Sequence, residues 1–122
     1  MKKIIILTFL AVLSLNTIVL ADDKYDILED RIENTLEQKY RSLSDGKGTM
    51  KIKEFDIDIF ENYINIQTET KSVPKNFDFD KAFADIVSMV KKEVPGATDI
   101  NISVELDKAL TEDEIVYNKS FK

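Results

Sequence analysis

Carboxylates are the only catalytic side chains that this sequence holds in abundance. Of its 122 residues 23 are Asp or Glu, whereas His and Cys are absent. An imidazole base, a thiol nucleophile and a Cys/His zinc site are therefore excluded. Asp56 and Asp58 are spaced like a general acid–base pair, which needs environments that push the two pKa values apart. The surrounding alternation places both on a solvated strand face, so we expect no active site there.

A second acidic pattern has the spacing of the first ligand positions of a calcium-binding loop. Asn76, Asp78 and Asp80 stand at alternate positions. An EF-hand also needs Gly at its sixth position and Glu at its twelfth, where this chain has Lys81 and Val87. We therefore interpret Asp78 or Asp80 as a helix cap. Weak calcium binding at Asp78/Asp80 or at residues 112–114 stays an alternative.

The overall charge argues against a nucleic-acid partner. The net charge is −6, and the sequence lacks the basic stripe that such proteins carry. Four lysines form a modest cluster, which acidic residues interrupt: Lys47, Lys51, Lys53 and Lys71. We interpret them as solvating charges near strand edges. No Gly-rich phosphate loop or haem motif is present, so we predict no cofactor.

The first 21 residues have the layout of a bacterial export signal. Two lysines precede an apolar stretch, and Val19-Leu20-Ala21 places small residues where a signal peptidase reads them. We predict cleavage between Ala21 and Asp22, delivery to the periplasm or the exterior, and a single mature domain, 22–122. Loss of Lys2 and Lys3 would change the net charge from −6 to −8. An uncleaved anchor is the alternative, although the apolar stretch is short for a bilayer.

Two helices are predicted from apolar residues that recur every three or four positions. One covers about 23–43 and ends before a turn at 44–48; the other covers about 79–94 and ends before Pro95-Gly96. The apolar stripe of the first helix contains Tyr25, Leu28, Ile32, Leu36, Tyr40 and Leu43. That of the second contains Phe79, Phe83, Ile86, Val90 and Val94. Each helix is expected to cover a core with this stripe.

A hairpin is predicted between the helices, from two segments of alternating apolar and polar residues. A two-residue loop at 61–62, with Asn62 in left-handed geometry, pairs Ile59 with Ile64 and Ile57 with Ile66 on one side. The same register pairs Asp58 with Asn65 and Asp56 with Gln67 on the other side. The apolar alternation breaks at Met50 and Ile52, so we expect a bulge or a late strand start near Lys53.

Residues 100–107 are predicted to form a strand, and residues 115–121 a short last one. The order is therefore α-β-β-α-β, with an added β. Each strand has one apolar face and each helix one apolar stripe, which predicts an α+β fold of two layers. Both helices should cover one face of a mostly antiparallel sheet, and the other face should meet solvent.

This order resembles the BON domain, a small module of bacterial envelope proteins. The hairpin at 57–70, the segment at 82–106 and the helix-to-strand junction Val94-Pro95-Gly96-Ala97 carry the resemblance. The glycines that the family has at the hairpin turn and near the end of the second strand are missing here. The resemblance implies an envelope-binding or envelope-maintenance module that contacts protein or phospholipid and has no catalytic residues.

The link at 72–80 is the most unusual segment, because it places Val73, Pro74 and Phe77 in a surface connection. Phe77 is expected either to staple the helix start or to anchor a partner. We add Tyr63, beside the hairpin turn, to these candidate partner-binding residues.

The sequence thus predicts an exported, non-catalytic envelope domain that contacts a protein or lipid partner through a loop, a sheet face or a strand edge. A secreted inhibitor or host-interaction protein is the alternative, and a carboxylate-based hydrolase is less favoured.

Overall fold

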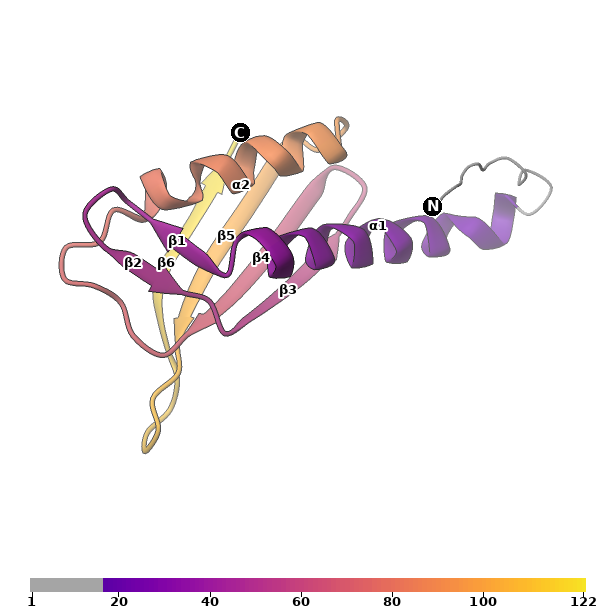
Figure 1. Ribbon diagram of the computed structural model, residues 1–122. Helices are drawn as coiled ribbons and strands as arrows, with labels where there is room; N and C mark the ends of the chain where they lie inside the picture. The colour runs from indigo at the N-terminus through magenta and orange to yellow at the C-terminus, as the bar shows by residue number, and fades with distance from the viewer. Residues whose placement is uncertain (1–16) are drawn as a thin grey trace.

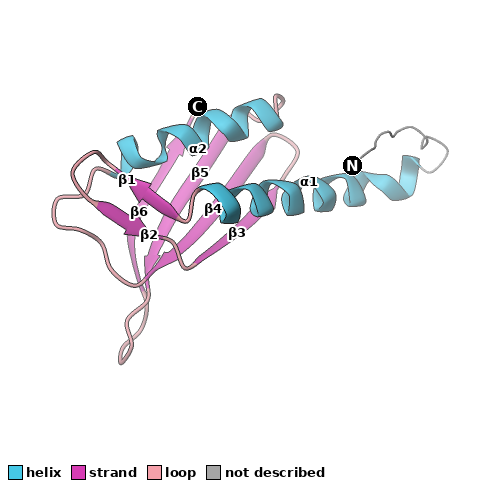
Figure 2. Ribbon diagram, viewed as in Figure 1, coloured by secondary structure: helices cyan, strands magenta, loops and turns pink. Residues whose placement is uncertain are grey.

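A computed structural model describes residues 17–122, with side chains from Tyr25 onward; most of the predicted signal peptide, 1–21, lies outside these described residues. The elements are α1 Thr17–Lys39, β1 Ser42–Ser44, β2 Thr49–Lys51, β3 Glu54–Ile59, β4 Tyr63–Thr70, α2 Phe79–Glu93, β5 Asp99–Leu106 and β6 Glu114–Phe121 (Figure 2). This α+β order confirms the prediction and adds the small β1–β2 hairpin. Within residues 17–122, no helix is both long and apolar enough to span a bilayer.

The small hairpin corrects the predicted end of the first helix. α1 ends at Lys39, and Leu43, which we placed on its apolar stripe, lies in β1 opposite Met50. Leu43 follows Tyr40 by three residues, a spacing that places both on one face of a helix. The strand prevails because it buries Leu43 against Met50, and both side chains are almost completely inaccessible to solvent.

A buried carboxylate closes the turn of this small hairpin. Asp45 Oδ1 accepts the backbone N–H groups of Lys47 and Gly48, each at 2.8 Å. Gly46 takes a φ of 93°, which glycine adopts without steric cost. Asp45 Oδ2 accepts the N–H of Asp78 at 2.9 Å. The turn is thereby tied to the start of α2, 33 residues further along the chain.

The larger hairpin has the predicted register. Ile59 faces Ile64 and Ile57 faces Ile66, while the polar partners lie on the opposite side. Phe60 N–H donates to the oxygen of Tyr63 at 2.7 Å, which leaves residues 61–62 as the loop. The expected left-handed geometry of Asn62 is wrong, since Asn76 is the only non-glycine residue with positive φ among residues 17–122. The late start of the strand is confirmed, because β3 begins at Glu54.

One four-stranded sheet joins the two halves of the chain. Its order is β3-β4-β5-β6. β4 and β5 are parallel neighbours, with α2 between them in the sequence, and the other two pairings are antiparallel. The last strand is present as predicted. The register shifts between Val104 and Glu105 of β5, so that Val116 is the extra, unpaired residue of a bulge on β6.

Both helices cover the same face of the sheet, so that the core lies between two layers (Figure 1). α1 contributes the fully buried Ile32 and Leu36, and α2 contributes Phe83, Ile86 and Val90. The inward side chains of the strands complete a single cluster, with Phe55, Ile57, Ile59, Ile64, Ile66, Ile100, Ile102 and Val104. Among residues 17–122, no helix lies on the opposite face of the sheet.

The start of α2 is linked to the edge strand β6. Asp78 is the N-cap and accepts the N–H of Lys81 at 3.2 Å. In the first helical turn, Asp80 accepts the Tyr117 hydroxyl at 2.6 Å and the Lys119 ammonium at 2.5 Å. Both hydrogen bonds lower the pKa of the Asp80 carboxyl, and the bond from Lys119 has the larger effect. Asp80 therefore ties β6 to the helix layer.

Candidate functional site

The uncovered face of the sheet is polar and acidic. Three complete rows of four residues cross it: Glu54–Glu69–Glu105–Ile115, Asp56–Gln67–Ser103–Asn118 and Asp58–Asn65–Asn101–Ser120. The rows hold five carboxylates and no Lys or Arg. Asn101 joins β5 to β6 on this face by donating to Asn118 Oδ1 at 3.0 Å and Ser120 Oγ at 3.1 Å. We call this surface the outer face.

Asp56 and Asp58 lie on the outer face and are both exposed. A general acid–base pair depends on burial or a charged neighbour that treats its two members differently. Their shared exposure on one strand offers no such difference. The carboxylate pair that the sequence brings together therefore has the surroundings of a solvated strand face.

A stacked aromatic pair stands at the hairpin end of the outer face. The rings of Phe60 and Tyr63 have centroids 5.1 Å apart and planes inclined by 21°. Their exposed fractions are 51% and 37%. Aromatic rings usually lose most of their exposed area to a core or an interface. No helix of the described part of the chain covers this face, so the exposed pair has the character of a contact surface.

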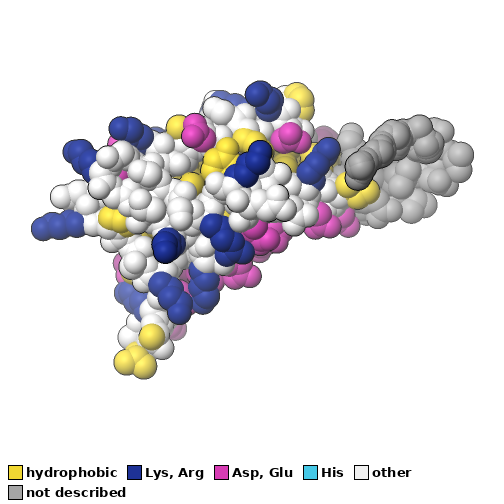
Figure 3. Space-filling model, in the orientation of Figure 1, with side chains coloured by type: hydrophobic (Ala, Val, Ile, Leu, Met, Phe, Trp, Pro, Cys, Tyr) yellow, Lys and Arg dark blue, Asp and Glu magenta, His cyan; other side chains and the backbone are white. Residues whose placement is uncertain are grey.

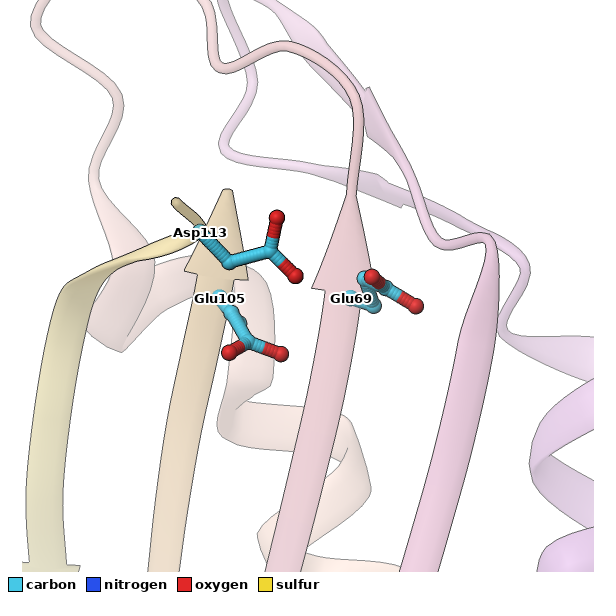
Figure 4. Close-up of side chains that lie close together, drawn as sticks. All are labelled: Glu69, Glu105 and Asp113. Carbon is cyan, nitrogen blue, oxygen red and sulfur yellow. The ribbon is translucent and has the colours of Figure 1, made fainter. Parts of the chain in front are cut away.

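An acidic cluster occupies the other end of the outer face. Glu69, Glu105 and Asp113 each place a carboxylate oxygen within 4.8 Å of the others (Figure 4). Burial raises the pKa of Glu69 above its usual value, and the charge of Lys53 opposes this rise. These residues could supply oxygen ligands to a metal ion. Ca²⁺ takes six to eight such ligands, and two of the three side chains are exposed, so the cluster alone does not define a metal centre.

The carboxylates of the suspected calcium loop are engaged elsewhere. Asp78 caps α2, as predicted, and Asp80 binds Tyr117 and Lys119. In the segment 112–114, Glu114 pairs with Lys108, whereas Asp113 belongs to the acidic cluster with Glu69 and Glu105. Asp78 and Asp80 are therefore structural groups that hold the start of α2.

The candidate residues of the link at 72–80 are less exposed than the anchor interpretation requires. Phe77 is only 9% exposed and packs edge-on against Phe79, with ring centroids 5.2 Å apart. Val73 and Pro74 are half-buried. The idea of Phe77 as an exposed anchor is therefore wrong. Its ring belongs to the core cluster, and the link around it packs against the small hairpin, where Pro74 lies beside Gly48 and Asp78 N–H donates to Asp45.

Tyr63 is the one member of the predicted set that lies open to a partner. It begins β4, whereas the link with Phe77 follows the end of that strand, roughly 23 Å away at about 3.3 Å per residue. The four candidates therefore do not form one site. Sequence reasoning missed Phe60, although Phe60 continues the outward alternation of Asp56 and Asp58 and could have been assigned to the same face.

No family model matches this chain, and a search of curated proteins finds no match.

Proposed function

We propose that this chain is a non-catalytic binding domain, exported to the bacterial envelope, that holds a basic protein partner against its outer face. The observation that carries the proposal is the exposed Phe60–Tyr63 pair beside three rows of polar and acidic side chains. Protein interfaces have aromatic residues at their centres and polar rims around them. The resemblance to the BON domain, whose members contact protein or lipid, agrees with a binding role.

The charge of the outer face favours a basic partner. Glu54, Glu69 and Glu105 are neighbours in one row. Like charges directly opposite one another destabilise a sheet. Lys and Arg side chains of a partner would offset this repulsion, and complementary charges would also speed association. The same acidic row disfavours anionic lipid and nucleic acid as occupants.

A photo-crosslinking experiment tests the proposal. p-Benzoylphenylalanine replaces Tyr63 in one variant and Leu110 in a control variant. Leu110 is 96% exposed in the connection between β5 and β6, at the opposite end of the sheet from Tyr63. We expect a defined envelope protein to crosslink from position 63 and not from position 110.

Two substitutions then decide whether the captured protein uses the aromatic pair. The double variant Phe60→Ala/Tyr63→Ala should weaken binding of that protein at least tenfold, as loss of an aromatic hot spot does. Leu110→Ala should leave binding unchanged, and added salt should weaken binding by both the wild type and Leu110→Ala. Equal binding by the wild type and the double variant would refute the proposal, as would crosslinking of equal strength from both positions.

A further inference from the structure

A second surface lies between the small hairpin and the main sheet and has the opposite charge. Its lining residues come from β2, from the end of β4 and from the short segments that follow each strand: Thr49, Lys51, Ile52, Lys53, Thr70, Lys71 and Ser72. We call this surface the lysine groove. Its volume of about 460 Å³ exceeds the hollows of about 190 and 130 Å³ on the outer face. It falls within the size range of small-molecule sites.

The lysine groove concentrates positive charge in an acidic protein. Three of its seven lining residues are lysines and none is acidic, although acidic residues outnumber basic ones by 23 to 17 in the chain. Figure 3 shows dark-blue side chains gathered where β2, β3 and β4 meet. Lys51 and Lys71 are exposed and take part in none of the ion pairs among residues 25–122. Two ammonium groups are thus available to a ligand.

The walls of the lysine groove are held in place by the fold. The buried Thr70 hydroxyl donates to the carbonyl oxygen of Lys51 at 2.6 Å, which joins the end of β4 to β2. Lys53 is fixed by its ion pair with Asp107, at 2.7 Å between Nζ and Oδ2. Lys53 therefore acts as a fixed part of the wall, while the exposed hydroxyls of Thr49 and Ser72 remain as donors. This combination of ammonium and hydroxyl donors suits a compact anion with several acceptor oxygens.

We propose that the lysine groove binds a phosphate-bearing ligand, with the ammonium groups of Lys51 and Lys71 on the phosphate oxygens. Lysine binds phosphate as a point charge. The groove is large enough for a phosphate monoester together with a small organic group. The proposal is independent of the partner suggested for the outer face, because the two surfaces share no lining residue.

Titration with inorganic phosphate and with glycerol phosphate, at constant ionic strength, tests the lysine groove. We expect saturable shifts of the backbone amide resonances of residues 51, 71 and 72 in nuclear magnetic resonance spectra. The double variant Lys51→Gln/Lys71→Gln should bind at least tenfold more weakly. Lys39→Gln/Lys92→Gln removes the same charge from exposed positions on α1 and α2 and should bind like the wild type.

A vesicle arm distinguishes a soluble ligand from a lipid headgroup. Flotation with phosphatidylglycerol vesicles and with phosphatidylcholine vesicles is compared for the wild type and the two double variants. Two results support the proposal: saturable binding of soluble phosphate, or flotation with phosphatidylglycerol vesicles but not with phosphatidylcholine vesicles. In either case the Lys51→Gln/Lys71→Gln variant must lose the binding. Non-saturable shifts together with no vesicle retention would overturn it. Equal loss in the two double variants would also overturn it, since the effect would then depend on net charge alone.

Discussion

Asp45 is the residue on which the tertiary arrangement of the small hairpin depends most. It is only 6% exposed, and its two oxygens accept three backbone N–H groups, from Lys47, Gly48 and Asp78. These hydrogen bonds lower the pKa of Asp45 to about 2, and the bond from Asp78 has the largest effect. Backbone donors held in place by the fold favour the charged carboxylate over the neutral acid.

The pH dependence of unfolding follows from this lowered pKa. Because the folded pKa lies below the ordinary 3.8, ionised Asp45 stabilises the fold above about pH 4. This stabilisation is lost as the pH falls towards about 2. We expect Asp45→Asn to have a lower urea midpoint than the wild type at pH 6, and the difference should shrink at pH 2.5.

A control separates Asp45 from other acidic groups. Asp85 is exposed on α2 and its side chain takes part in no hydrogen bond within the described part of the chain. Asp85→Asn should therefore follow the wild type at both pH values. If Asp45→Asn unfolded at the same urea midpoint as the wild type at pH 6, the three backbone hydrogen bonds to Asp45 would not stabilise the fold.

At the scale of the element, the central strand β4 divides the molecule into a dry side and a wet side. Ile66 lies between Ile57 and Ile102 and is fully buried, whereas its neighbour Gln67 is exposed on the outer face. The side chains of a strand alternate with a period of two. A shift of one residue in register would therefore exchange the two faces.

Paired substitutions on β4 test this division. Ile66→Ala should destabilise the fold by about 2–5 kcal/mol, because it leaves a cavity in a packed core. Gln67→Ala should change stability by no more than about 0.5 kcal/mol, as exposed positions do. Urea unfolding of both variants provides the measurement. Similar losses at the two positions would contradict the register.

At the scale of the whole molecule, the charges are segregated. The outer face carries five carboxylates in its three rows, while the lysine groove has three lysines and no acidic residue among its lining. Such segregation allows two oppositely charged ligands to bind without competing for one surface. The net charge alone would suggest a uniformly acidic surface.

Export is a prediction about the whole chain. Expressed in a bacterium with its own N-terminus, the protein should be recovered outside the cytoplasm as a chain that begins at Asp22. Intact mass and N-terminal sequencing would measure this. Ala21→Phe places a bulky residue at the cleavage position and should block processing. Recovery of the wild type with Met1 still attached would contradict the prediction.

The sequence by itself determined the order of the main elements, the register of β3 with β4 and the polar character of the outer face. These features follow from local periodicity, which records the face that each residue buries. For the same reason the alternation alone assigns Asp56, Asp58 and Tyr63 to the surface.

Only the tertiary structure decided the features that depend on contacts between distant segments. Leu43 lies in a strand because it pairs with Met50, and Phe77 lies in the core because the link packs against the small hairpin. The pairing of β4 with β5 brings Glu69 beside Glu105, and Asp113 joins them from the connection before β6. The lysine groove forms where β2 approaches the end of β4. The spacing of residues along the chain does not predict these contacts, because they depend on how complete helices and strands pack against one another.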